Sequence, residues 1–279
     1  MNSLVADGEF AIRLGVFLGM LATLALLETR WPRRVLSVSR ARRWVSNFGI
    51  SLINTAVLRL ILPVAGVGAA LLAKEQGWGL FNLLALPSWL AILLFLIVFD
   101  LTIYFQHRLF HRVPLLWRLH RMHHTDPDVD LSTGNRFHPL SFLLSGLIKL
   151  ALVLLLGPPL VAVVLAEVVL NATSMFNHSN LRLPPGLDRA LRRVLVTPDM
   201  HRIHHSLDDT EHNRNFGFNF SWWDRLFGTY QDQAALPQQT LRLGIEGFQG
   251  AGLIRLAAML VQPWQNPSLP GSAGEASQP

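Results

Sequence analysis

The stretch of sequence that decides the fold is HRLFHRVPLLWRLHRMHH, residues 107–124. It opens with an HxxxH pattern and closes with HxxHH, and a second HxxHH follows in TPDMHRIHH, residues 197–205. On a helix, residues three and four apart project from one face, so each pattern presents its imidazoles together. The three clusters hold eight of the chain's eleven histidines: His107, His111, His120, His123, His124, His201, His204 and His205. This clustering at helical spacing predicts a metal site.

The number and type of these side chains limit the metal chemistry. A catalytic zinc ion normally takes about three protein ligands, so eight imidazoles suit two metal ions with roughly four ligands each. The chain has neither the HExxH motif of metalloproteases nor the Glu and ExxH set of ferritin-like di-iron bundles. It also has no cysteine, which excludes thiolate zinc sites and Cys-ligated iron–sulfur clusters. Imidazole suits iron, copper, zinc or nickel, so ligand type alone leaves the metal open.

The composition is that of a membrane protein. Of the 279 residues, 51% are hydrophobic and only 15% are charged, whereas soluble domains carry about 25% charged residues. The net charge of +6 comes mainly from arginines that flank apolar runs and form no groove-reading motif, so we expect no nucleic-acid partner. The N-terminal segment MNSLVADGEF lacks the basic region of a cleaved signal peptide, so we expect the first apolar run to be retained.

The apolar runs predict an all-α integral membrane protein with about four transmembrane helices and a cytoplasmic, helical, histidine-rich cap. Residues 10–27, 48–73 and 88–106 are long enough to cross a bilayer. Residues 141–176 form a helical hairpin that turns at Gly157-Pro158-Pro159 and either spans the membrane or re-enters it. The loop after the first run contains Arg30, Arg33, Arg34, Arg40, Arg42 and Arg43. The positive-inside rule makes that loop cytoplasmic, and the histidines then fall on the same side.

Ionisable residues inside these spans need partners, because isolated charges are costly in a bilayer. Equal depth on antiparallel helices predicts an Arg59–Asp100 pair and a Lys149–Glu167 pair, although snorkelling of Lys149 and Glu167 to different interfaces is the alternative. Asp100 and Tyr104 also share a helical stripe with the first histidine pair. They are therefore candidates to orient the metal ligands from behind.

The remaining segments complete a single predicted domain, residues 1–265, followed by a tail, residues 266–279, expected to be disordered. Thr197-Pro198-Asp199 reads as a helix start that carries the second HxxHH. The aromatic residues Trp222, Trp223 and Phe227 suit an interfacial belt, a lid or core packing. Residues 252–261 are apolar but too short to span, so we expect an interfacial helix there.

The histidine patterns resemble a known family. HRLFH, LHRMHH and HRIHH are similar to the HxxxH, HxxHH, HxxHH signature of the fatty acid hydroxylase/sterol desaturase superfamily. The flanking segments WRLHRMHHTDPDVDLSTGNRFHP, FNHSN, TPDMHRIHHS and WWDRLFGTY are similar too, so the resemblance covers residues 100–230. It implies that the eight boxed histidines bind metal together with His178, that His138 is a further candidate ligand, and that His212 is a weaker one.

The family's members are membrane-bound, non-haem di-iron enzymes that use O2 and an external electron donor. The resemblance therefore implies two iron ions, which zinc can replace during purification, and a partner reductase or ferredoxin-like protein. A site beside lipid tails favours an oxidase that hydroxylates or desaturates a C–H bond of a sterol, fatty acyl or related lipid. The expected location is the inner or plasma membrane. The alternatives are a dinuclear zinc lipid hydrolase, which would use the same imidazoles to activate water, and a non-enzymatic membrane metal-binding protein.

Four arginines interleave the histidines of the first stretch, namely Arg108, Arg112, Arg118 and Arg121. They are candidates to dock an acidic electron donor or lipid headgroups. Anchoring of the chain by the positive-inside rule accounts for them equally well.

Overall fold

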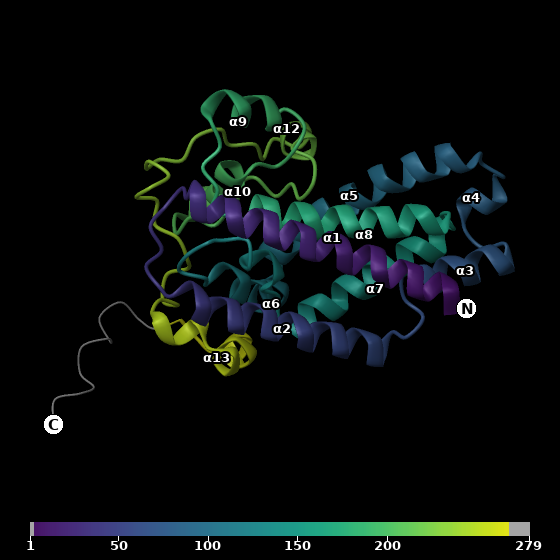
Figure 1. Ribbon diagram of the computed structural model, residues 1–279, viewed down its shortest axis with the longest axis horizontal. Helices are drawn as coiled ribbons and strands as arrows, with labels where there is room; N and C mark the ends of the chain where they lie inside the picture. The colour runs from purple at the N-terminus through teal and green to yellow at the C-terminus, as the bar shows by residue number, and fades with distance from the viewer. Residues whose placement is uncertain (1–2, 268–279) are drawn as a thin grey trace.

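Five long apolar helices make up the body of the protein. A computed structural model gives the structure of residues 3–267, and in this part of the chain the only β pairing is a few isolated bridges. The long helices are α1 (Ser3–Arg30), α2 (Arg40–Ile61), α5 (Ser88–Arg112), α7 (Pro139–Leu156) and α8 (Leu160–Asn177). All five are long and apolar enough to cross a membrane, and they run roughly along the long axis of the molecule (Figure 1). The predicted all-α membrane architecture is confirmed, with five candidate spans instead of about four.

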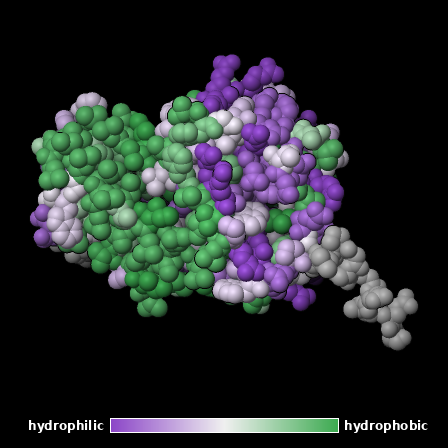
Figure 2. All heavy atoms as spheres, turned by 180° about the vertical axis from the view of Figure 1, so that it is seen from behind, coloured by the Kyte–Doolittle hydropathy of each residue, from purple (hydrophilic) through white to green (hydrophobic). Residues whose placement is uncertain are grey.

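Short elements gather at the two ends of this bundle. At one end lie α3 (Val67–Gln76) and α4 (Leu80–Leu83). The opposite end carries the cap, formed by α6 (Pro114–His124), η1 (Thr133–Asn135), α9 (Pro185–Leu191), α10 (Pro198–His204), α11 (Asp209–His212), α12 (Trp222–Leu226), η2 (Ala251–Ile254), α13 (Leu256–Val261) and η3 (Gln262–Trp264). Figure 2 shows an apolar surface over the α3 and α4 half of the molecule and a polar surface over the cap. The apolar end suits a lipid environment, and the polar cap suits water.

The hairpin of α7 and α8 turns where the sequence predicts. Gly157 ends α7 with a left-handed φ of 61°, and the two prolines after it set the start of α8. The turn packs tightly against the loop before α4, where a Cβ on Gly79 would lie 2.3 Å from the backbone nitrogen of Gly157. The hairpin is therefore joined to the α3–α4 end of the bundle at a contact that has room only for glycine.

The prediction of one crossing over residues 48–73 is wrong. α2 begins earlier, at Arg40, and ends at Ile61, and α3 begins only at Val67. Leu62 leaves the helical region with φ −124° and ψ 64°, because Pro63 disfavours a helical conformation in the residue before it. Gly66 then turns the chain with a φ of 67°.

The two predicted ion pairs have opposite outcomes. Lys149 lies 3.8 Å from Glu167, as predicted, and Arg13 of α1 also contacts Glu167, at 2.6 Å. The Arg59–Asp100 pair is wrong: Arg59 is exposed near the end of α2 and Asp100 is buried in α5. The equal-depth argument failed because α2 stops at Ile61, so Arg59 lies at a helix end and Asp100 at mid-helix.

α8 is the central helix and packs against both α1 and α5. Its small residues Ala162 and Ala166 are buried there, beside Phe95 and Phe99 of α5. The predicted helix at 252–261 is present as η2 and α13, and α13 buries Met259 against Ile50 of α2. Most of the predicted disordered tail, residues 268–279, lies outside the described residues.

Candidate metal centre

Nine histidines meet at the junction of the bundle and the cap, in two neighbouring groups. The five-histidine group consists of His107, His111, His120, His124 and His204. The four-histidine group consists of His123, His178, His201 and His205. Within each group, one ring nitrogen from every histidine lies within 4.8 Å of the others. All nine histidines expected from the sequence are therefore brought together, and neither group includes a carboxylate among the residues described.

Each HxxHH pattern is divided between the two groups. His120 and His124 of α6 join the five-histidine group, whereas His123 faces the other one. At the end of α10 the assignment is reversed, because His201 and His205 enter the four-histidine group and His204 crosses over. Histidines four apart therefore stay together, and the one between them reaches the neighbouring group.

Backbone carbonyls fix the orientation of four of these rings. The Nδ1 atoms of His107 and His204 lie 2.9 Å and 2.8 Å from the carbonyl oxygens of Phe216 and Arg214. The Nδ1 atoms of His123 and His178 lie 3.1 Å and 2.7 Å from those of Arg136 and Ser174. Since a carbonyl only accepts, each of these Nδ1 atoms carries the proton and each Nε2 presents a free lone pair.

The free lone pairs face one another, which tests whether a metal fits. The Nε2 atoms of His107 and His204 are 2.9 Å apart, and those of His123 and His178 are 3.0 Å apart. Two nitrogens without protons cannot hydrogen-bond, so such a contact is repulsive unless a cation lies between them. Ligand nitrogens about 2.0–2.1 Å from one metal ion lie about 3 Å apart at a right angle. His205 is fully buried with no partner at either ring nitrogen. The donor set fits metal ions.

The local environment keeps the imidazoles neutral. Eight of the nine rings are buried, and His111 is partly so. Burial, followed by repulsion from neighbouring imidazoles, lowers the pKa well below its ordinary value at His120, His123, His124, His201, His204 and His205. Burial also lowers the pKa of His178 to about 3. The neutral imidazole is the form that binds a metal ion.

A carboxylate behind the five-histidine group holds the loop that anchors it. Asp224 of α12 is fully buried and accepts hydrogen bonds from the backbone nitrogens of Phe216 and Gly217, at 2.7 Å and 2.8 Å. Burial raises the pKa of Asp224 to about 6. Through its two hydrogen bonds to the loop, Asp224 fixes the position of the Phe216 carbonyl, which orients His107. Sequence reasoning missed this residue, although it belongs to the quoted segment WWDRLFGTY.

The two candidates on the α5 stripe support the same loop and do not touch the histidines. Asp100 accepts hydrogen bonds from the backbone nitrogens of Asn219 and Phe220 and from the indole of Trp223, at 2.8 Å for the last. The Tyr104 hydroxyl lies 2.8 Å from the hydroxyl of Thr229. Their predicted influence on a bound metal would therefore act through the loop.

The remaining two histidines lie outside both groups. His138 begins α7, where its Nδ1 accepts from the Leu140 nitrogen and its Nε2 donates to the Leu260 carbonyl at 3.1 Å. Both nitrogens are thus engaged in holding backbone. His212 stacks on Trp117, with ring centroids 5.5 Å apart, beside the five-histidine group.

The arginines and aromatics of the cap divide between structural and exposed positions. Arg121 is buried and donates to the Gln262 carbonyl, so it is not available to a partner, whereas Arg112 and Arg118 are exposed. Trp223 is buried against Asp100, and Trp222 is exposed. Of the three predicted roles of the aromatics, core packing is seen at Trp223, and the interfacial belt and the lid stay predictions.

The N-terminal helix is tied to the site although it provides no histidine. Glu28 of α1 is fully buried, and one of its oxygens accepts from the backbone nitrogens of Leu131 and Asn180, at 2.8 Å and 2.7 Å. Asn180 follows His178 by two residues, so α1 supports the segment that carries this candidate ligand. Arg33, just after α1, pairs with Asp199 of α10 at 2.9 Å.

Comparison with known proteins gives consistent matches. The family model for fatty acid hydroxylase matches residues 92–229. The chain is 32% identical over 182 residues to an ornithine lipid hydroxylase, OlsE, of Rhizobium tropici, covering 64% of this chain and 51% of that protein. It is 31% identical over 156 residues to the alkylglycerol monooxygenase of Homo sapiens, covering 56% of this chain and 34% of that one.

A third relative is the methylsterol monooxygenase 2-2 of Arabidopsis thaliana, 28% identical over 181 residues, or 62% of this chain and 67% of the relative. The chain spans about half of the bacterial hydroxylase and about a third of the human monooxygenase. No solved structure matches the chain. Each of these three relatives is named as a hydroxylase or a monooxygenase.

Proposed function

The chain belongs to the fatty acid hydroxylase/sterol desaturase superfamily, and from this premise we propose that it is a membrane-bound, di-iron, O2-dependent oxidase. Its reaction is the hydroxylation or desaturation of a C–H bond in a membrane lipid. The relatives' names cover an ornithine lipid, an alkylglycerol and a methylsterol, so the substrate is proposed at the level of lipid. The proposed location is the inner or plasma membrane, with the metal centre on the cytoplasmic side.

The observation that carries the proposal is the arrangement of nine imidazoles in two adjacent groups, without a carboxylate, where the apolar helices meet the polar cap. The five-histidine group would hold one iron ion and the four-histidine group the other. Two irons with O2 supply the oxidising power that an unactivated C–H bond requires. The named relatives favour this chemistry over zinc-dependent hydrolysis.

The chain's own residues would bind and orient these ions and keep water away. Backbone carbonyls hold the proton on Nδ1 of four rings, so that each Nε2 lone pair is directed at an ion. Burial keeps the rings neutral, and the apolar helices deliver a lipid tail to the same end of the bundle. Because the chain has no cysteine for an iron–sulfur cluster, electrons would come from a separate reductase or ferredoxin-like protein.

The experiment compares lipid extracts of a host with and without the gene, in air and under anoxia, by mass spectrometry. We expect a lipid that gains one oxygen or loses two hydrogens only in air. The His123→Ala variant should insert into membranes equally well and lose this product. An unchanged lipid profile in air contradicts the oxidase, and a hydrolysed lipid that forms equally under anoxia supports a hydrolase instead.

A further inference from the structure

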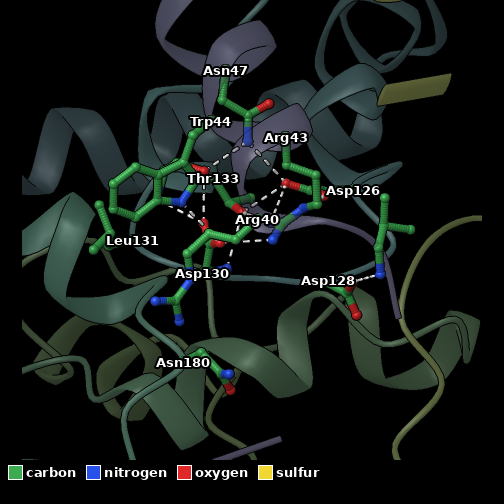
Figure 3. Close-up of polar contacts among 12 residues, drawn as sticks. Arg40, Arg43, Trp44, Asn47, Asp126, Asp128, Asp130, Leu131, Thr133 and Asn180 are labelled. Atoms are coloured by element: carbon green, nitrogen blue, oxygen red, sulfur yellow. Dashed lines mark hydrogen bonds and ion pairs between the residues drawn. The ribbon is translucent and has the colours of Figure 1, made fainter. Parts of the chain in front are cut away.

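A buried ion cluster lies behind the four-histidine group and involves no histidine. Arg43 of α2 is fully buried, and its guanidinium donates to Asp126 through Nε and Nη2, at 2.7 Å and 2.9 Å. The same guanidinium donates through Nη1 to Asp130, at 2.7 Å. Figure 3 shows these side chains, together with Asn47 and Thr133, pointing toward one another. The guanidinium thus joins both ends of one short loop segment to α2.

Asp126 and Asp130 are fully buried together with Arg43, so the guanidinium is matched by carboxylates on two sides. Asp126 also accepts from the Thr133 hydroxyl at 2.8 Å and from the Asn47 amide at 3.2 Å. Each buried charge is therefore paired and hydrogen-bonded, which is the condition for a buried ion pair to be tolerated.

From this loop, one line of contacts leads to His123. Arg136 ends the loop, and its guanidinium donates to the Asn47 side chain at 3.1 Å and to the Met122 carbonyl at 3.0 Å. The carbonyl of Arg136 is the acceptor that orients His123. Asn47 thus contacts both Asp126 and Arg136, so the position of the Arg136 carbonyl depends on the ion cluster.

A second line leads to His178. The Ser174 hydroxyl donates to the Gly134 carbonyl of the loop at 2.8 Å, and the Ser174 carbonyl is the acceptor that orients His178. The contact is so close that a Cβ on Gly134 would lie 2.6 Å from the Ser174 carbonyl oxygen. The loop therefore carries the Arg136 carbonyl that orients His123, and it contacts Ser174, whose carbonyl orients His178. The Nε2 atoms of these two histidines face each other.

We propose that Arg43 and Asp126 are positioning residues for the metal ion of the four-histidine group alone, acting through the loop at residues 126–136. The inference rests on the proposed di-metal centre. The five-histidine group receives its two carbonyl anchors from Arg214 and Phe216, on a loop that Asp224 holds. Loss of the Arg43–Asp126 pair should thus weaken one metal and spare the other.

The test measures iron(II) affinity of the purified, metal-free full chain in detergent, by anaerobic competition with a coloured chelator. Loss of a partner that orients a metal ligand typically lowers metal affinity about 10- to 100-fold. We expect Asp126→Asn to weaken one of two iron sites by that factor. The matched control is Asp128→Asn in the same loop, whose carboxylate accepts only from the Ser37 and Val38 segment, at 2.8 Å from each nitrogen. It should bind both irons as wild type does.

Two backgrounds identify which ion is weakened. The double variant His107→Ala/His111→Ala leaves only the four-histidine group complete, and adding Asp126→Asn should weaken its single iron. The double variant His178→Ala/His205→Ala leaves the five-histidine group complete, and Asp126→Asn should have no effect there. Equal weakening on both backgrounds contradicts the proposal, since a general loss of structure would act on both groups.

A smaller change tests the same loop in case the Asp126→Asn variant does not fold. Ser174→Ala removes one hydroxyl and its bond to Gly134, and it should weaken the same iron site while the metal-free chain still unfolds in one cooperative transition. A wild-type chain that binds no iron overturns the proposed function and this inference together. Wild type with two irons, and Asp126→Asn and Ser174→Ala with two irons of unchanged affinity, overturns the inference alone.

Discussion

The two histidine groups of the candidate metal centre present the same imidazole side chains but are supported differently. The five-histidine group is partly exposed at His111, and its anchoring loop is held by Asp224 through backbone nitrogens. The four-histidine group is fully buried, and its anchoring loop is held by the Arg43 ion cluster. The identity of the side chains at a site and the residues that support them are therefore separate features of the molecule. Two ions with the same donor type should therefore respond differently to changes in the residues behind them.

The largest expected effect is the loss of a ligand from the buried group. His205→Ala removes a ring whose two nitrogens have no other partner, so we expect one iron per chain to be lost. The lipid product should fall more than about 100-fold, beyond the usual effect of removing an orienting partner. Metal analysis and the lipid assay measure both. His138→Ala is the control. If it also loses an iron, His138 belongs to one of the two groups and their assigned membership is wrong.

The next effect tests the loop of the four-histidine group by steric displacement. Gly134→Ala places a methyl group 2.6 Å from the Ser174 carbonyl oxygen, and overpacking of this kind costs about 1–3 kcal/mol. We expect a lower unfolding temperature of the metal-free chain and a weaker four-histidine iron site. Gly186→Ala, which has nothing within 4 Å of its added methyl, should change neither. A Gly134→Ala variant with the unfolding temperature and the iron affinity of wild type would contradict the close contact.

Asp224 should give the five-histidine side a pH dependence. Its pKa is raised from 3.8 to about 6, so between these values the folded chain holds a proton that the unfolded chain has released. Its contribution to stability therefore falls as pH rises through this window, by roughly 3 kcal/mol. The lowered pKa values of the buried histidines act in the opposite direction, because their contribution to stability rises with pH. Thermal unfolding of the metal-free chain at several pH values should therefore show a steeper rise in stability for Asp224→Asn than for wild type. Identical profiles for the two proteins would contradict burial as the cause.

The smallest effect concerns a histidine beside the five-histidine group but outside it. His212→Phe preserves the stack on Trp117 and removes a contact with the exposed Asp209, 3.5 Å away. Such exposed pairs contribute about 0–1 kcal/mol, so we expect two irons and a lipid product within about twofold of wild type. A lost iron would instead enlarge the five-histidine group to six.

The sequence predicted which histidines converge, because their spacing on short helices is a local property. It did not predict that His123 and His204 each leave their own pattern for the other group, since this depends on how α6 and α10 are packed. Pro63 interrupts the apolar run at residues 48–73, so the Arg59–Asp100 pair, which requires a continuous helix there, is wrong. Hydropathy predicted the helices of the bundle well, because each helix must be apolar over its own length.

The supports of the centre could not be predicted, since they join distant segments. Arg43 lies 83 residues before Asp126, and its basic neighbours gave it the pattern of an ordinary cytoplasmic loop. Asp224 belongs to the segment WWDRLFGTY, whose sequence alone does not indicate which backbone groups the carboxylate contacts. Arg43 acts on the distant side chains of Asp126 and Asp130, and Asp224 accepts from backbone nitrogens, which leave no mark on the amino-acid sequence.

The contacts of Glu28 have a consequence for the order in which the chain is made. α1 precedes the backbone partners of its buried carboxylate, because Leu131 and Asn180 lie 103 and 152 residues further along the chain. During translation Glu28 can meet Arg40 early, but its bond to Asn180 must wait until α8 has left the ribosome. α1 is thus fixed against the histidine-bearing segments only after the helices that follow it in the chain have been made.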